Sequence, residues 1–133
     1  MTETPNNLAL ASAFVPAPAD RVWETISDLS RWPEIFSGWL ASVTPDDDRF
    51  GATGTNNERY DLYPHPAEDR RAVDVEVVDE LGSSDVLRIR LIDTRGGCFI
   101  VAVAAKLVGV SDDDWQRVSG AIGDGVAAIG ELL

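Results

Sequence analysis

Two short stretches near the start of the chain decide the fold, Val15-Pro-Ala-Pro-Ala-Asp-Arg-Val-Trp23 and Asp28-Leu-Ser-Arg-Trp-Pro-Glu-Ile-Phe36. The first follows an apolar run over residues 8–15 that contains no helix breaker and ends at two prolines. Such a run predicts a strand. Pro18 suits the first turn of a helix, because the N–H that proline lacks would have no partner there. A strand followed directly by a helix is therefore expected.

The helix that follows is amphipathic. Val22, Ile26 and Leu29 recur at spacings of four and three, which predicts a helix over residues 18–29 with one apolar face. The second stretch predicts a short second helix, which Ser30 can cap through its hydroxyl. Two consecutive short helices after the first strand are expected.

The middle of the chain is predicted to be β. Polar or glycine-containing turns separate six expected strands, over residues 41–44, 50–55, 58–63, 71–80, 85–93 and 98–108. Alternation is clearest at Val73, Val75 and Val77, between which acidic residues lie. One buried and one solvent-facing side of a sheet requires this pattern. The outward set is expected to comprise Arg59, Asp61, Asp74, Glu76, Arg88 and Arg90.

The chain ends in a predicted helix. Ser111 followed by Asp114 resembles a capping box with Asp in place of Glu. An apolar stripe at spacings of three and four follows, made of Trp115, Val118, Ile122, Val126, Ile129 and Leu133. This stripe must pack across the apolar face of the sheet, which gives an α+β domain.

Length and composition exclude several classes of protein. The 133 residues fit a single domain, expected at 8–133 after a flexible tail at 1–7. Eleven basic and 23 acidic residues give a net charge of −12, which disfavours nucleic acid and anionic membranes as partners. No apolar run is long enough for a bilayer span, so a cytoplasmic protein without membrane insertion is expected. One cysteine, Cys98, and one histidine cannot make a structural zinc site, and no metal or cofactor is expected.

The two opening stretches resemble the START/Bet v 1-like (SRPBCC) superfamily, whose members begin with a strand, an A-P-x-x-x-V-W helix start and a D-x-x-x-W-P second helix. The Trp-Pro-x-x-Phe piece is similar to polyketide cyclases, and residues 115–133 are similar to the closing helix of the activator-of-Hsp90-homologue branch. The resemblance implies a helix-grip fold, with a curved antiparallel sheet around a long C-terminal helix and a cavity between them. It implies a cavity ligand or a co-chaperone role, since one fold hosts unrelated functions.

Three side chains are candidates for proton transfer. Tyr60 is expected to point inward, because Arg59 and Asp61 then point outward; its hydroxyl needs a ligand carbonyl or a neighbouring carboxylate as partner. Glu58 has the same parity and is either functional or a solvated strand end. His65, in a turn predicted at residues 64–69, is either an acid–base group at the cavity mouth or an ordinary surface histidine.

The candidate ligand-binding residues on the strands are apolar or aromatic side chains that the expected register turns inward. The resemblance adds Trp32, Phe36 and Trp39, because the second helix flanks the cavity entrance in helix-grip proteins. Trp115 begins the last helix and is placed to close the opposite end. Phe99 and Val101 belong to the set on the assumption that Lys106 points outward. Plain core packing is the alternative for each aromatic residue. The full set is Trp32, Phe36, Trp39, Tyr60, Leu62, Val75, Ile89, Phe99, Val101 and Trp115.

The function expected from these features is binding of a small hydrophobic or polyketide-like molecule between the sheet and the last helix. Cyclisation or dehydration of that molecule is the enzymatic form, and the sequence leaves open whether catalysis occurs. The alternative is a non-enzymatic, co-chaperone-like interaction module that uses its acidic outer surface. Because the chain is short for the superfamily, a partner subunit could complete the cavity, and a homodimer is among the expected assemblies.

Overall fold

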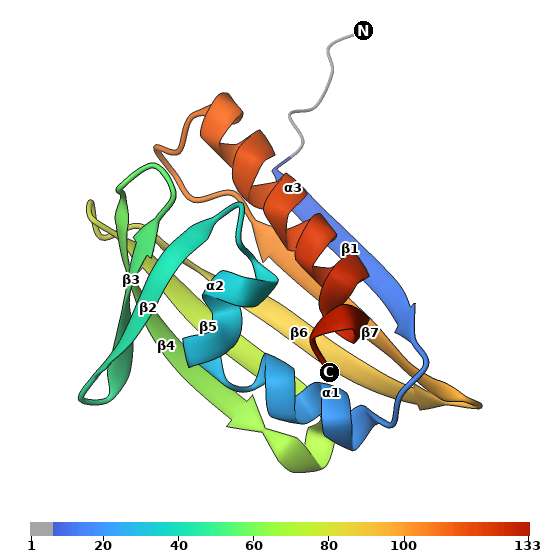
Figure 1. Cartoon of the computed structure of the whole chain (residues 1–133). Helices are drawn as coiled ribbons and strands as arrows, with labels where there is room; N and C mark the ends of the chain where they lie inside the picture. The colour runs from blue at the N-terminus through green and yellow to red at the C-terminus, as the bar shows by residue number, and fades with distance from the viewer. Residues whose placement is uncertain (1–6) are drawn as a thin grey trace, which may run out of the picture.

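The computed structural model describes residues 7–133. These residues form one seven-stranded antiparallel sheet in the order β1-β7-β6-β5-β4-β3-β2 (Figure 1). The strands are β1 Leu8–Val15, β2 Leu40–Asp46, β3 Arg49–Gly54, β4 Arg59–Ala67, β5 Ala72–Asp79, β6 Ser84–Thr94 and β7 Gly97–Ala105. The helices are α1 Ala19–Ile26, α2 Trp32–Ile35 and α3 Asp112–Ala128, with 3-10 turns at Leu29–Arg31, Glu68–Arg70 and Ile129–Leu132.

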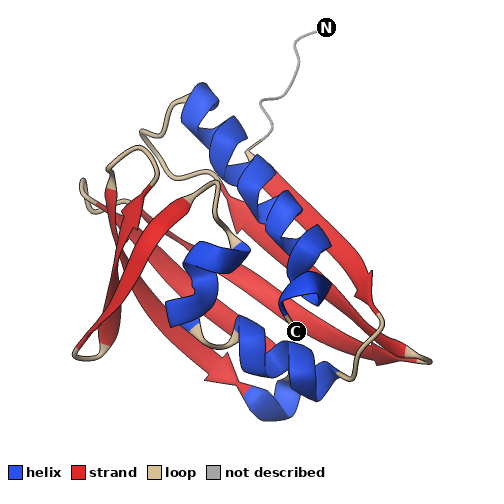
Figure 2. Ribbon diagram, in the orientation of Figure 1, coloured by secondary structure: helices blue, strands red, loops and turns tan. Residues whose placement is uncertain are grey.

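All three helices lie on the concave side of the curved sheet, with α3 along β1 and β7 (Figure 2). This arrangement confirms the predicted α+β helix-grip fold. No helix within residues 7–133 is long and apolar enough to cross a membrane. The predicted tail lies outside the described residues except for Asn7, whose carbonyl oxygen accepts a hydrogen bond of 2.8 Å from the amide of Lys106.

Local contacts hold α1 and α2 against the sheet. The α1 helix is shorter than predicted, because the Ser27 hydroxyl donates to the Trp23 carbonyl and ends it. The predicted cap at Ser30 is wrong: the Asp28 carboxylate accepts a hydrogen bond of 3.1 Å from the Ser30 amide instead. Trp32 is fully buried and donates its indole N–H to the Ile26 carbonyl at 2.9 Å, which fixes the two helices together.

The long helix begins as predicted. The Ser111 hydroxyl accepts a hydrogen bond of 3.1 Å from the Asp114 amide. Trp115, Ile122 and Val126 of the predicted stripe are buried, together with Ile129 in the following turn. The stripe therefore packs onto the sheet and the short helices, and it forms one side of the core.

The outer face of the middle strands is polar, as predicted. Asp74 and Arg90 point outward and form an ion pair at 2.6 Å. Tyr60 and Leu62 are buried on the inner face of β4. The charged side chains thus lie on the outer face and the apolar side chains on the inner face, as the alternation in β5 and β6 predicts.

Two expectations about the sheet are wrong. Residues 64–66 do not form a turn, because β4 continues to Ala67 and pairs with β5 up to that residue. Only β5 borders this part of β4, because β3 pairs with β4 no further than Leu62. On the side of β4 that has no neighbouring strand, the prolines therefore remove no hydrogen bond. In β7 the inward residues are Cys98, Ile100, Ala102 and Ala104; Phe99 and Val101 face outward.

Candidate ligand pocket

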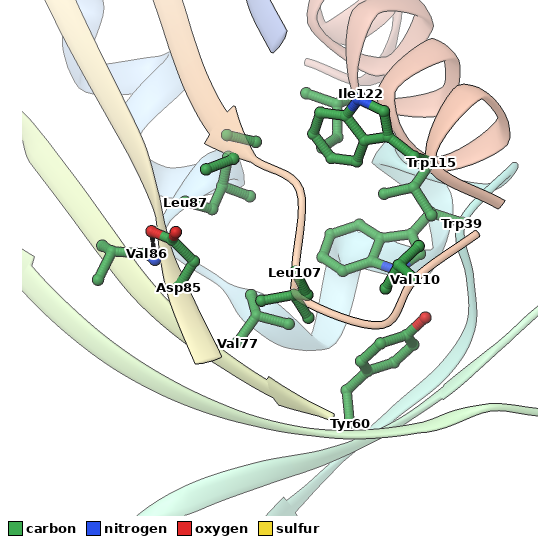
Figure 3. A pocket seen from close by; sticks show the side chains of 13 residues that line it. Trp39, Tyr60, Val77, Asp85, Val86, Leu87, Leu107, Val110, Trp115 and Ile122 are labelled. Carbon is green, nitrogen blue, oxygen red and sulfur yellow. Dashed lines mark hydrogen bonds between the residues drawn. The ribbon is translucent and has the colours of Figure 1, made fainter. Parts of the chain in front are cut away.

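A small, partly open pocket lies between α3 and one end of the sheet (Figure 3). Its volume is about 50 Å³. Trp39, Tyr60 and Trp115 face the strand residues Val77 and Leu87 across it. The complete lining is Trp39, Tyr60, Val77, Asp85, Val86, Leu87, Ala104, Ala105, Leu107, Val110, Trp115, Val118 and Ile122. Apart from the Tyr60 hydroxyl, the Asp85 carboxylate and two indole N–H groups, these side chains are apolar.

Tyr60 and Glu58 form a polar pair beside the pocket. The Tyr60 hydroxyl donates a hydrogen bond of 2.8 Å to Glu58 Oε2, so its partner is the neighbouring carboxylate. Burial raises the pKa of Tyr60 to about 12, and the hydrogen bond to Glu58 and the charge of that carboxylate add to this effect. Glu58 is half-buried just before the first residue of β4. Tyr60 therefore stays protonated at neutral pH, with its proton directed at Glu58.

The indole donor of Trp39 has no well-aligned acceptor. Its indole Nε1 is buried and, within residues 7–133, makes no hydrogen bond of acceptable geometry. It lies close enough to the Tyr60 oxygen to lower the pKa of Tyr60, against the larger effects that raise it. A buried N–H that bonds poorly loses part of the free energy of a hydrogen bond, up to about 1–3 kcal/mol when no acceptor is near. An acceptor atom on a bound molecule would remove that cost.

A series of three ring contacts, two edge-to-face and the middle one tilted, positions Trp39. The ring centroids of Trp32 and Phe36 are 5.1 Å apart, those of Phe36 and Trp39 6.2 Å, and those of Trp39 and Tyr60 5.9 Å. Gly54 makes room at the last contact, because a Cβ there would lie 3.2 Å from the Tyr60 ring. The second short helix thus places one wall of the pocket.

Arg117 of α3 links the elements around Tyr60. Its Nη1 donates to Thr55 Oγ1 at 2.7 Å and to the Gly38 carbonyl at 3.1 Å. These bonds tie the start of α3 to the segment after α2 and to the turn after β3. The positive charge also lowers the pKa of Tyr60. Sequence reasoning missed Arg117, since a single arginine on a helix looks like an ordinary surface residue.

Two turns approach each other beside the pocket. Leu107 and Val110 line the pocket from the segment between β7 and α3. Gly109, in the same segment, has a φ of 92°, and a Cβ there would lie 3.8 Å from Leu81 in the turn between β5 and β6. Leu81 and Val108 are both strongly exposed. Both turns beside the pocket therefore carry an exposed apolar side chain.

The structure brings only some of the predicted site residues together. Trp39, Tyr60 and Trp115 line the pocket. The other inward members are buried in the core away from it, namely Trp32, Phe36, Leu62, Val75 and Ile89.

Phe99, Val101 and His65 lie on the opposite side of the sheet. Phe99 packs its ring against Phe14 at 5.6 Å on the outer face. His65 is exposed on β4 opposite Asp74, on the face away from Tyr60. Asp85, a pocket residue that sequence reasoning missed, lies at the start of β6 and accepts a hydrogen bond of 2.7 Å from the Val86 amide. Within residues 7–133, no group of three or more His, Cys, Asp or Glu is arranged to hold a metal ion.

A curved sheet gripping a long helix, with a pocket between them, defines a helix-grip protein. The sequence profile of the family described as "Polyketide cyclase / dehydrase and lipid transport" matches residues 15–97. The chain belongs to that family. No curated protein matches it in sequence.

Solved structures with the same fold share little sequence with this chain. XoxI from Bacillus cereus superposes with a TM-score of 0.68 at 13% identity, covering 94% of each chain. Truncated norcoclaurine synthase from Thalictrum flavum gives a TM-score of 0.60 at 17% identity, covering 87% of this chain and 90% of the other. DynU16, a protein of the dynemicin biosynthetic locus, gives 0.59 at 16% identity, covering 90% of this chain and 46% of its own.

Proposed function

We propose that the protein binds a small, neutral, largely apolar molecule in the pocket between α3 and the sheet. The observation that carries the proposal is the pocket itself, an opening lined almost entirely by apolar side chains between α3 and the sheet. The two turns beside it carry the exposed apolar side chains Leu81 and Val108. A filled interior would have favoured the alternative, an interaction module acting through the outer surface, so the pocket favours ligand binding.

The size of the pocket limits the ligand. A volume of about 50 Å³ holds one or two water molecules, whereas ligand pockets commonly measure about 300–1,000 Å³. A polyketide-sized molecule therefore requires the walls to move. The segment of residues 106–110 is the wall best suited to move, because it lies between β7 and α3 outside any helix or strand, and Val108 within it is strongly exposed. We infer that a single-ring molecule enters beneath this segment.

The charges around the pocket favour a neutral ligand. Asp85 is the one carboxylate in the lining, and the chain as a whole carries a net charge of −12. Both disfavour a carboxylate ligand such as a fatty acid. The Nε1 of Trp39, which has no well-aligned acceptor, favours a molecule with one acceptor oxygen, such as a ketone.

The geometry supports binding better than catalysis. Tyr60 could give a proton to a bound molecule only by breaking its hydrogen bond to Glu58, and its raised pKa makes it a weak acid at neutral pH. In the enzymatic form, a cyclase or dehydratase, Tyr60 would transfer the proton and Glu58 would position it. The family description covers both cyclases and lipid carriers, and so supports either role.

Calorimetric titration with three ligands of similar size tests the proposal. Acetophenone has an apolar ring and one acceptor oxygen, ethylbenzene lacks the acceptor, and benzoate is charged. We expect acetophenone to bind best, ethylbenzene about fivefold more weakly because one hydrogen bond is lost, and benzoate more weakly still.

A pocket-filling variant provides the control. In Ala104→Val, two added carbon atoms enter the pocket from β7, and acetophenone affinity should fall at least about tenfold. Ala127→Val, at an exposed position of α3, should bind like the wild type. Absence of binding to all three ligands, or unchanged affinity in Ala104→Val, would refute the proposed site.

A further inference from the structure

The outer face of the sheet differs between its two halves. On β4 to β6 the outward side chains include six charged residues, Arg59, Asp61, Asp74, Glu76, Arg88 and Arg90. On β1 and β7 the outward side chains carry no charge. We call this uncharged region the β1–β7 face; it consists of Leu8, Leu10, Ser12 and Phe14 of β1, Phe99, Val101 and Val103 of β7, and Ile92 of β6.

The large side chains of this face are continuous and exposed. Phe14 lies opposite Phe99, which lies opposite Ile92, so the three form one row across three strands. Leu10 is 71% exposed, Leu8 57%, Ile92 53%, Phe14 49% and Phe99 43%. With about 200 Å² for each fully exposed side chain, they present roughly 500 Å² of apolar surface, near the upper limit for a monomer. A face of this kind is typical of an interface.

The two edge strands of the sheet also differ in their protection against association. The β2 edge carries a bulge between Leu40 and Ser42, and it ends in Pro45 and Asp46. Bulges, prolines and charges are the usual protection against association at a sheet edge. The β1 edge, Leu8–Val15, has eight residues without a charge or a proline. Only the β2 edge is protected, so contact is to be expected on the β1 side.

We propose that the β1–β7 face is the contact between two copies of this chain, which pack their sheets face to face. Two copies that each carry a charge of −12 repel one another, and the repulsion is smallest where neither presents a charge. A two-fold axis at the centre of the face would place Leu8 and Leu10 of one copy against the aromatic row of the other. A stable interface needs about 800 Å² from each partner, and the large side chains supply more than half of it.

Sedimentation velocity over a wide range of protein concentration tests the proposal with the full chain. We expect the wild type to reach twice the 14.4 kDa of one chain, and salt to favour the dimer because it screens repulsion. Leu10→Lys and Phe99→Lys should each weaken dimerisation by at least about tenfold. Leu81→Lys, which changes an even more exposed leucine on the β5–β6 turn, should dimerise like the wild type.

Each other outcome contradicts the proposal. A wild type that stays monomeric at high concentration and high salt overturns it, as does a dimer that survives both lysine variants with unchanged affinity. A monomer that instead binds neutral lipid vesicles, or another protein, in a manner sensitive to Leu10→Lys assigns the face to that partner. Denaturant midpoints close to the wild-type value in both variants exclude misfolding as the cause of a monomer.

Discussion

Two glycines of α3 provide a sharp test of how this helix packs. Gly125 is buried, and a Cβ there would lie 2.6 Å from the Phe36 ring and would also clash with the Ile35 carbonyl. Gly120 is exposed, and nothing within residues 7–133 lies within 4 Å of the position of its Cβ. The same substitution by alanine should therefore have different effects at two sites only five residues apart.

The magnitudes follow from helix propensity and packing. Gly120→Ala should stabilise the protein by about 0.5–1 kcal/mol, because alanine loses less backbone entropy in a helix. Gly125→Ala gains the same amount, but the overpacking costs about 1–3 kcal/mol. The free energies of unfolding should therefore differ by about 1–3 kcal/mol between the variants, with Gly125→Ala the less stable.

Urea denaturation followed by tryptophan fluorescence measures this difference. With a slope of about 1–3 kcal/mol per M, the two midpoints should lie roughly 1 M apart. Gly125→Ala should also alter the fluorescence of the folded state, since Phe36 contacts both Trp32 and Trp39. Equal stabilisation by both substitutions would show that α3 does not press against α2, and the reasoning about the pocket wall would be refuted.

Two further predictions concern the core and Tyr60. Ile122→Ala removes a buried side chain that lines the pocket, and it should lower the free energy of unfolding in urea by about 2–5 kcal/mol. Val108→Ala, at an exposed position, should change that free energy little. An unchanged midpoint for Ile122→Ala would contradict the packing of α3. The pKa of Tyr60 is raised in the folded state from 10 to about 12, so its contribution to stability is complete below pH 10 and is lost as the pH rises to about 12. Over that interval the wild type should lose about 2 kcal/mol relative to Tyr60→Phe, and parallel pH profiles of the two proteins would contradict this.

The parts of the fold that the sequence predicted correctly have strong local signals. The alternation of valines with charged residues in β5 fixes which face is buried, and the resulting parity of β4 places Tyr60 inside. The Ser111 cap and the stripe of α3 likewise depend on contacts between near neighbours in the chain. Where polar and apolar residues alternate, elementary pattern reasoning is sufficient.

The failures occur where that contrast is missing. Every side chain from Cys98 to Ala105 is apolar, so alternation gives no parity for β7, and Lys106 lies beyond the last paired residue. The outer apolar face therefore appeared only in the structure. The turn predicted around His65 is wrong for another reason. The prolines beside His65 are compatible with a strand, because β4 has no neighbouring strand on one side at this point.

The pocket was beyond sequence reasoning for a geometric reason. Its lining comes from β4 to β7, α3 and the segments that flank them, so no spacing in the chain reveals it. Tyr60 was a candidate because of its parity, and Trp39 because it follows the second helix, which flanks the cavity in the helix-grip fold. Asp85 and Arg117 acquire their significance only from where the fold places them.

The central claim is that the pocket beside Trp39 takes up a small neutral molecule, and nuclear magnetic resonance of the indole N–H groups tests it most directly. Labelled protein is titrated with acetophenone, and the Trp39 signal is assigned by its loss in Trp39→Phe. The account predicts that the Trp39 signal shifts with added acetophenone until the site is saturated. The signal of Trp23, which lies outside the pocket, should stay in place. In Ala104→Val the shift of the Trp39 signal should be abolished. No movement of the Trp39 signal, or equal movement in the wild type and Ala104→Val, would contradict it.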